Sequence, residues 1–251
     1  NVQGDEEYIV VEMGMTKPGH IKQLVDIVPP DMALLTEIAL VHAENFESIE
    51  GIALAKAEIF SHPKTRLALI SQDAPCSAFL QAQAICKTML YSMKDMQADF
   101  SLEVKDDCLM FQHQKLPFIA LPAPHVYLNL LAACAMASCC GMTIDEIGSA
   151  LASIKMPEKR LEVITKNGIC FVNDSYNAAE PSLKAALSYI KSVTDAKRKI
   201  AVIGQMRELG RFSESCHASV GLHALDCVDK MYCLGEECAC GLQIFRNLPQ
   251  H

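Results

Sequence analysis

Short apolar runs and amphipathic stretches alternate along this chain. Residues 32–38 form a short apolar run after two prolines, which predicts a buried strand. Residues 48–60 predict a helix, because Ser48 can cap its start and Glu50 lies in the first turn, where a carboxylate is favourable. One face of this helix is mostly apolar and consists of Ile49, Ile52, Ala53, Lys56, Ile59 and Phe60.

The same alternation precedes and follows this pair. Residues 8–13 are an apolar run interrupted by Glu12, which predicts a strand ending on an acid, and residues 19–27 predict a short helix. Residues 66–71 predict another strand and residues 77–91 another helix. Strand-helix-strand order predicts a parallel sheet, and ligands bind at the carboxyl ends of the strands in such sheets.

The pattern changes between residues 99 and 121, where polar turns separate short apolar runs. It predicts an antiparallel insertion at the sheet edge. The expected strands are 100–104, 108–112 and 118–121. Residues 126–140 and 144–154 then predict helices, and residues 155–158 read as an interdomain linker.

After the linker, strands and helices alternate again. Strands are expected at 169–173, 199–204 and 230–234, and helices at 181–192 and 213–225. Asp174 directly follows the first of these strands. The chain is therefore an α/β protein with a second α/β layer, whose strand-end loops can carry ligands.

Composition and charge narrow the class of protein. The chain has 251 residues, 51% apolar and 21% charged, which is ordinary for a globular protein and argues against disorder. This length accommodates one large domain or two medium ones. The net charge of −8 argues against a nucleic-acid groove as the main surface, although a bound cation or a helix N-terminus can still attract an anion.

The chain contains 12 cysteines, which lie on apolar helical stretches or near the end of the sequence. They show neither zinc-site spacing nor the density of a disulfide scaffold, so we interpret them as reduced thiols of a cytosolic protein. A metal site at Cys233, Cys238 and Cys240 is the less favoured alternative. No apolar run reaches membrane-spanning length, and no signal peptide is visible.

Lys56 is the unusual residue of the 48–60 helix, because it lies on the apolar face. A buried ammonium needs an anionic partner, a shifted pKa or a chemical modification. The alternative is that its side chain reaches the rim of the apolar face. His42 and Glu44, between the expected strand and helix, can bind a metal or a proton, although His42 also fits an ordinary loop position.

The stretch from Thr36 to Phe60 resembles the central-domain motif of the Mur ligases, ATP-dependent amide-forming enzymes of peptidoglycan synthesis. The family pattern is close to T-N-I-x-x-A-H-x-E-x-F-x-S-x-E-x-I-A-x-A-K-x-E-I. The matching residues are Thr36, Ile38, His42, Glu44, Phe46, Ser48, Glu50, Ile52, Ala53, Ala55, Lys56, Glu58 and Ile59. The chain departs from the pattern at Glu37, where the family usually has Asn, and at Val41, usually Ala.

Further motifs resemble the family in the same order. Residues 122–133 are similar to P-G-x-H-N-x-x-N-A-L-A-A, and residues 159–162 to G-R-L-E. Residues 173–182 are similar to D-S-Y-N-A-N-P-x-S, and residues 204–210 to G-D-M-x-E-L-G followed by H-x-x-x-G. The departures are Ala123, Val126, Ala179, Glu180 and Gln205, whereas His217 and Gly221 match.

The resemblance implies a magnesium site. Glu12 and His42 are the residues expected to ligate the cation, and Lys56 is expected to be carbamylated, which turns an ammonium into a carboxylate-like ligand. These three are also the expected catalytic residues, and we expect them to converge on one divalent cation. Magnesium prefers oxygen ligands, so a single histidine among oxygens is workable but not diagnostic.

The resemblance also implies an ATP site and a site for the amino acceptor. The residues expected to bind the nucleotide are His125, Asn129, Arg160 and Asp174. Tyr176 and Asn177 are expected near the acceptor. From the residues alone, His125 also fits a helix cap, Asn129 a polar residue near a helix start, and Arg160 a surface arginine after a proline.

For the fold, the resemblance implies part of a central mononucleotide-binding domain at 1–157, followed by part of a Rossmann-like domain at 158–251. No glycine-rich phosphate loop is present, so we expect a fragment that is inactive alone, lacking that loop and an N-terminal domain. The implied substrates are UDP-N-acetylmuramoyl-tripeptide and D-alanyl-D-alanine, joined through an acyl phosphate by a monomeric cytoplasmic enzyme. The alternatives are another Mur or folylpolyglutamate-type ligase, or a non-catalytic α/β binding module.

Overall fold

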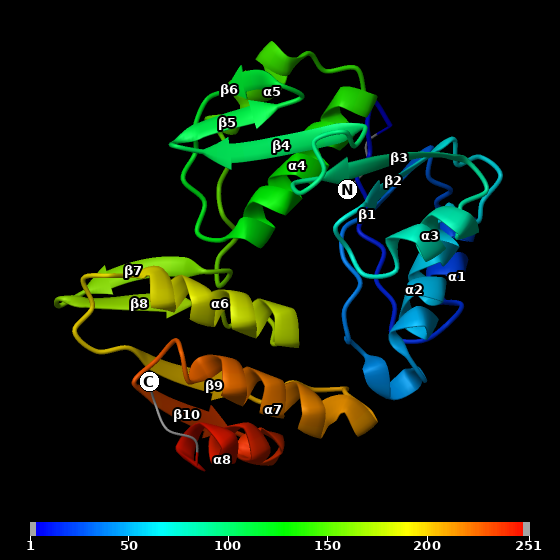
Figure 1. The fold of residues 1–251 in the computed structure, drawn as a ribbon. Helices are drawn as coiled ribbons and strands as arrows, with labels where there is room; N and C mark the ends of the chain where they lie inside the picture. The colour runs from blue at the N-terminus through cyan, green and yellow to red at the C-terminus, as the bar shows by residue number, and fades with distance from the viewer. Residues whose placement is uncertain (1–3, 248–251) are drawn as a thin grey trace.

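The structure is a computed structural model that describes residues 4–247. A six-stranded sheet forms the centre of its first part. Its strand order is β1-β2-β3-β4-β5-β6 (Figure 1). The strands are β1 Met32–Leu35, β2 Leu67–Ser71, β3 Lys87–Ser92, β4 Phe100–Lys105, β5 Cys108–Phe111 and β6 Gln114–Leu116. The first four are parallel, while β4, β5 and β6 are antiparallel, which confirms the expected insertion at the sheet edge.

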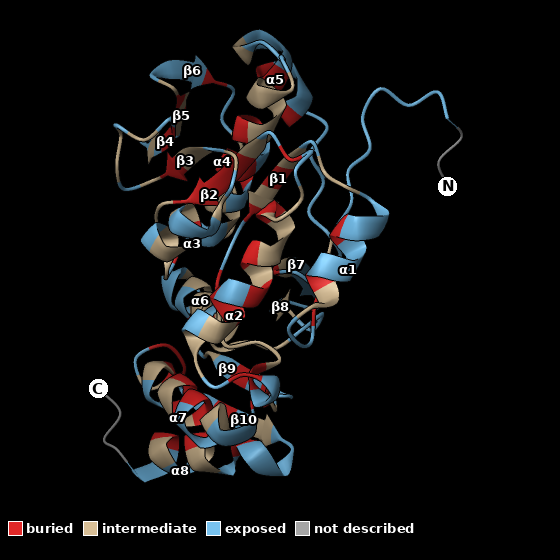
Figure 2. Ribbon diagram, turned by 90° about the vertical axis from the view of Figure 1, so that its right-hand side faces the viewer, coloured by how far each residue is buried: buried red, intermediate tan, exposed pale blue. Residues whose placement is uncertain are grey.

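Helices cover both faces of this sheet, as a parallel sheet requires. The helices are α1 His20–Ile27, α2 Ile49–Ala57, α3 Ser77–Gln83, α4 Pro124–Cys139 and α5 Ile144–Leu151. Side chains alternate along β2, so Ala68 and Ile70 join the core beneath α1, α2 and α3, whereas Leu69 joins the core beneath α4 and α5. The buried positions lie between these layers in Figure 2.

The helix predicted at 48–60 is confirmed, with a change of geometry in its last turn. Ser48 accepts a hydrogen bond from the Gly51 N–H at 3.3 Å and so caps α2. A 3-10 turn, Glu58–Phe60, continues the helix, and Phe60 is fully buried. This face of the helix therefore packs against the sheet, as its apolar residues predicted.

The strand predicted at residues 8–13 is wrong. Within the described range this segment pairs with no strand, and Val10 is 97% exposed. Figure 2 shows the chain running away from the sheet before α1. An apolar run becomes a strand only when a neighbour accepts its backbone hydrogen bonds, and β1, at the edge of the sheet, pairs only with β2.

Two further predictions need correction. The helix expected at 77–91 ends at Gln83, because Lys87–Ser92 is taken up as strand β3 between β2 and β4. The third strand of the insertion is Gln114–Leu116 rather than 118–121, since a tight turn at Gln112 and His113 starts the hairpin earlier. In both cases strand pairing outweighs the local pattern.

The second part of the structure contains a hairpin and a smaller parallel layer. The elements are β7 Glu162–Lys166, β8 Ile169–Asn173, α6 Glu180–Ser192, β9 Ile200–Gly204, α7 Ser213–Ala224, β10 Lys230–Leu234 and α8 Ala239–Asn247. Strands β9 and β10 are parallel, as predicted. Of the antiparallel β7–β8 pair, only β8 was predicted from the sequence. Helix α8 was not predicted.

Helices α7 and α8 cross in close backbone contact. A Cβ added at Gly221 would lie 2.2 Å from the carbonyl oxygen of Gly241. A Cβ added at Gly241 would lie 2.4 Å from the carbonyl oxygen of His217, one turn earlier on α7. Only glycine permits this approach, which gives a structural reason for the H-x-x-x-G pattern.

The structure bears on the expectations about the cysteines and about membrane-spanning segments. All 12 cysteines lie in the described range and are free thiols. Residues 4–247 contain no group of three or more His, Cys, Asp or Glu side chains arranged to hold a metal. In the same range no helix combines the length and apolarity needed to cross a bilayer.

Candidate functional site

The loop that follows β1 carries the first group of candidate residues. His42 has a left-handed backbone, with φ of 52°, and precedes a 3-10 turn at Ala43–Asn45. Phe46 then packs into the core and fixes the end of the loop. A left-handed non-glycine residue is held by its surroundings at some cost, a feature that is common at functional sites.

Lys56 lies on the inner face of α2, as predicted, and its side chain reaches the carboxyl end of β1. Its Nζ donates to the Glu37 carbonyl oxygen at 2.7 Å. Burial lowers the pKa of the Lys56 ammonium, and the negative charge of Glu37 partly opposes this. The pKa of the Glu37 carboxyl is raised, because burial outweighs the opposing effects of the Ile38 N–H, Lys56 and Lys94.

Glu12 lies on the exposed segment that precedes α1. Among the described residues, no hydrogen bond or ion pair joins Glu12, His42 and Lys56. Their convergence on one cation therefore stays a prediction. The donors fit magnesium only in part: the His42 Nε2 is free of hydrogen bonds to described residues, whereas Lys56 as an amine offers no anionic oxygen.

Candidate residues of the linker and of the loop after β8 lie close together. The Arg160 guanidinium lies over the Tyr176 ring, 4.2 Å from its centroid. Asp174, directly after β8, accepts a hydrogen bond from the Leu161 N–H at 3.0 Å. The Tyr176 N–H donates to the Lys159 carbonyl at 3.2 Å, so the linker motif and the strand-end loop form one unit.

His125 lies in the first turn of α4, on the first part of the structure. Partial burial of the imidazole lowers the pKa of His125, and the negative charge of Asp174 opposes this change. Asn129 is exposed one turn further along α4. Asn177 uses its side-chain oxygen to accept from the Ala178 N–H at 2.8 Å, which is a local turn contact.

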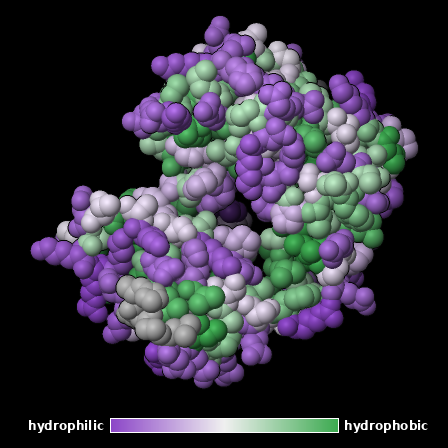
Figure 3. Space-filling model, viewed as in Figure 1, coloured by the Kyte–Doolittle hydropathy of each residue, from purple (hydrophilic) through white to green (hydrophobic). Residues whose placement is uncertain are grey.

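A cavity of about 500 Å³ lies beside this unit. Its walls come from the loop before α4, the linker and the second part of the structure. Its lining residues are Ala120, Leu121, Pro122, Met156, Pro157, Glu158, Leu161, Glu162, Val163 and Tyr189. The space-filling view shows a hollow between the upper part and the β7–α6 region (Figure 3).

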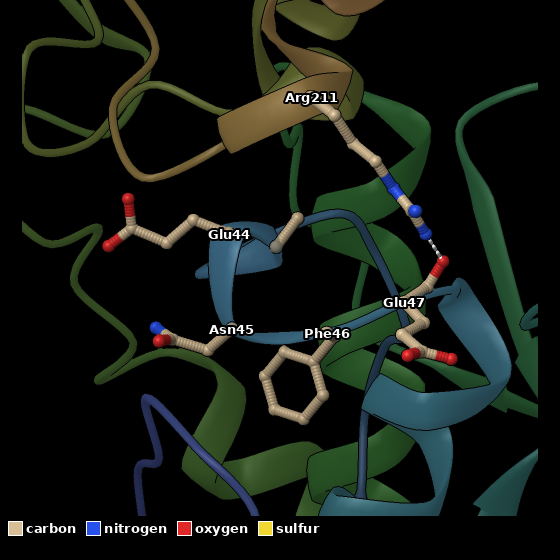
Figure 4. Close-up of a pocket in the computed structure, with 6 residues that line it drawn as sticks. Glu44, Asn45, Phe46, Glu47 and Arg211 are labelled. Carbon is tan, nitrogen blue, oxygen red and sulfur yellow. Dashed lines mark hydrogen bonds between the residues drawn. The ribbon is translucent and has the colours of Figure 1, made fainter.

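The loop after β9 contacts the loop that follows β1 and carries His42, called the His42 loop below. No role was assigned to this loop after β9 from the sequence. Glu208 pairs through Oε2 with the His42 Nδ1, and its carbonyl oxygen accepts from the Glu44 N–H at 3.0 Å. Arg211 donates to the Glu47 carbonyl oxygen, as the dashed line in Figure 4 shows. The M-x-E-L-G run marked this loop in the sequence, but nothing in its spacing indicated the partner.

A second cavity, of about 350 Å³, lies at this contact and is lined by Ala43, Glu44, Asn45, Phe46, Glu47 and Arg211. In Figure 4 the side chains of Glu44 and Asn45 point away from Arg211. The polar groups of this cavity therefore do not converge on one point. We assign it no ligand.

Known proteins resemble the chain over both parts. The Mur ligase middle domain matches residues 1–137, and the Mur ligase glutamate ligase domain matches residues 159–246. The UDP-N-acetylmuramoyl-tripeptide--D-alanyl-D-alanine ligase of Bacillus subtilis (strain 168) is 32% identical, covering 92% of this chain and 51% of that protein. The chain thus spans about half the length of the curated relatives it matches.

Solved structures agree with the sequence matches. A crystal structure of MurF from Acinetobacter baumannii has a TM-score of 0.84 at 26% identity, over 99% of this chain and 56% of that one. MurF ligase from Thermotoga maritima, in complex with ADP, has a TM-score of 0.75 at 26% identity, over 91% of this chain and 54% of that one. With one family domain matching more than half of its residues, the chain belongs to the Mur ligase family.

Proposed function

We propose that this chain is part of a D-alanyl-D-alanine-adding ligase and contributes residues to its ATP site and to the site where the amide bond is formed, without being active alone. The observation that carries the proposal is the unit of Arg160, Asp174 and Tyr176. It joins the linker and the loop after β8. Relatives bearing this activity in their names, and a structural neighbour solved with ADP, support the substrate class.

The reaction would proceed in two steps. A carboxylate oxygen of UDP-N-acetylmuramoyl-tripeptide attacks the γ-phosphorus of ATP, which forms an acyl phosphate and releases ADP. The amine of D-alanyl-D-alanine then attacks the acyl carbon, the C–O bond to phosphate breaks, and loss of a proton leaves the amide. Both steps bring anions together, so positive groups must compensate their charge.

Arg160 is suited to the phosphates, because its planar fork can bind two oxygens at once and stays charged. Stacking on Tyr176 restricts the guanidinium before the nucleotide arrives, which reduces the entropy lost on binding. We place Asn129 and Asp174 at the nucleotide, and Tyr176 and Asn177 near the acceptor. We also place the boundary between the two domains at residues 157 and 158.

Magnesium, when bound, would supply positive charge between the phosphate and carboxylate groups. Glu12, His42 and Lys56 would hold it, Lys56 as a carbamate. The lowered pKa of Lys56 supports this assignment, since a neutral amine is the form that reacts with carbon dioxide. The protein would act as a cytoplasmic monomer.

Phosphate release by the complete protein tests the proposal. Release should require ATP, UDP-N-acetylmuramoyl-tripeptide and D-alanyl-D-alanine together. Arg160→Ala should lower the rate about 10²-fold, as expected when one donor to a developing charge is lost. Arg198→Ala, an exposed arginine of the same part, is the matched control and should leave the rate unchanged.

The other outcomes identify the alternatives. Release with a different amino acid in place of D-alanyl-D-alanine would assign the protein to another amide ligase. No release with any acceptor would indicate a binding module. Equal rates for the two arginine variants would refute the role given to Arg160.

A further inference from the structure

We propose that Glu208 is a positioning residue for His42, supplied from the other part of the molecule. The proposal rests on the proposed function only for the importance of His42. The residues are 166 positions apart in the sequence, yet the Glu208 Oε2 contacts the His42 Nδ1. A carboxylate here would do what carboxylates do for functional histidines elsewhere: choose which ring nitrogen carries the proton and hold the ring orientation.

The identity of the partner determines the tautomer. An ionised carboxylate can only accept hydrogen bonds, so the His42 Nδ1 must carry the hydrogen that it donates to Glu208. The Nε2 then keeps its lone pair in the neutral ring. No hydrogen bond of the described residues uses this Nε2, so it is available to a cation or a substrate proton.

Glu208 reaches His42 because its whole loop docks on the His42 loop. The Glu208 carbonyl accepts from the Glu44 N–H at 3.0 Å, and Arg211 donates to the Glu47 carbonyl. Gly210 has φ of 53°, and a Cβ added there would lie 2.9 Å from the Glu44 Cα. Docking of the loop therefore forms these three contacts with the backbone of the His42 loop and places the Glu208 carboxylate at His42.

A buried histidine on α7 also holds the start of this loop. His217 is 3% exposed, and its Nε2 accepts from the Met206 N–H at 3.0 Å. Its Nδ1 donates to the Ser213 carbonyl at 2.8 Å. With both ring nitrogens engaged, His217 ties the start of the loop to α7. Glu208 is thus presented by a loop whose backbone is already ordered.

The consequence is a coupling between docking of the two parts and the state of the imidazole. When the loops are docked, Glu208 selects the Nδ1–H tautomer and fixes the ring. When they separate, the His42 imidazole loses the only hydrogen-bond partner that it has among the described residues, and the ring can rotate and exchange tautomers. An Nε2 lone pair with a fixed direction would exist only in the docked arrangement.

Nuclear magnetic resonance can read this tautomer directly. The complete protein would be labelled with 15N at histidine, and long-range 1H–15N spectra recorded near pH 9, where free histidine is neutral. His42→Gln identifies the His42 signals. We expect the Nδ1–H pattern to dominate in the wild type, and Glu208→Ala to return His42 to the tautomer ratio of an unfolded peptide.

Two glycine variants separate docking from the carboxylate itself. Gly210→Ala should shift the His42 signals in the same direction as Glu208→Ala, because the added Cβ meets the Glu44 backbone. Gly168→Ala is the matched control: this glycine also has a positive φ, of 74°, but open space where the Cβ would lie. It should leave the His42 tautomer unchanged.

An Nδ1–H pattern that persists in Glu208→Ala, or that is missing from the wild type, would overturn the proposal. So would equal effects of Gly210→Ala and Gly168→Ala. Signals of the buried His217 report whether each variant is folded, and Glu208→Asp provides a conservative variant that should keep part of the Nδ1–H population. The measurement needs neither ATP nor a cation, so its result is independent of the proposed ligase activity.

Discussion

Replacing Gly221 with alanine should destabilise the protein, although alanine is the better helix former. The added Cβ would lie 2.2 Å from the Gly241 carbonyl oxygen, far inside contact distance. The clash is between two helix backbones, so no side-chain rotation can relieve it. Helices α7 and α8 would have to move apart, and Phe245, which is 4% exposed on α8, would lose packing.

The magnitude follows from two opposing effects. Alanine in place of glycine inside a helix stabilises by about 1 kcal/mol. Overpacking in a filled interior costs about 1–3 kcal/mol, and a contact between rigid backbones falls at the upper end of that range. The net loss expected for Gly221→Ala is therefore about 2 kcal/mol, which lowers the melting temperature by about 4–8 °C in a chain of this size.

Gly51→Ala is the matched control, because Gly51 also lies inside a helix. Its Cβ would meet only Phe46, at an ordinary 3.7 Å, so the helix-propensity gain of about 1 kcal/mol should appear. Urea unfolding of the three proteins measures both changes. The reasoning fails if the two variants shift stability in the same direction.

Three further outcomes are expected. Tyr91→Phe should cost about 0.5–1.5 kcal/mol in urea unfolding, because the buried Tyr91 hydroxyl donates to the Leu35 carbonyl at 3.1 Å and phenylalanine removes that bond; an unchanged stability would count against this. The pKa of Glu180 is lowered, because hydrogen bonds from neighbouring side chains outweigh the opposing effect of burial. Its contribution to stability is therefore present above the unfolded pKa and lost as the pH falls through the folded pKa, so Glu180→Gln should flatten the decline of stability below about pH 4.5; an unchanged decline would contradict the assignment. Burial raises the pKa of Cys134 to about 11, so iodoacetamide at pH 8 should modify it far more slowly than the exposed Cys170, with the difference narrowing at higher pH; peptide mass spectrometry gives both rates.

The parts of the fold that could be predicted are those with local signals. The α2 helix has a capping serine, an acid in its first turn and a periodic apolar face, and each of these acts within a few residues. Strand β3 lacks such independence, because its sequence also suits the end of a helix. Its conformation is decided by pairing with β2 and β4 on either side. Both neighbours lie outside the short stretch of sequence from which a local pattern is read.

The candidate site shows the same division. The apolar pattern around Lys56 predicted a charged residue on the inner face of α2. In the structure Lys56 is half-buried and donates to the Glu37 carbonyl, just after the end of β1. Arg160 and Tyr176, which are in contact, are close in the sequence, and each was singled out by its own motif. Glu208 was missed, because its partner His42 belongs to another part of the fold.

The way the two parts meet bears on how this contact tolerates mutation. At two of its points the partner on the His42 loop is a peptide group, at residues 44 and 47, rather than a side chain. Those positions are free to vary without losing the bonds, since every amino acid supplies a carbonyl and all but proline an N–H. Gly210 has no such freedom, because a Cβ there would meet the Glu44 backbone, so residues 44 and 47 can change without breaking the junction while residue 210 cannot.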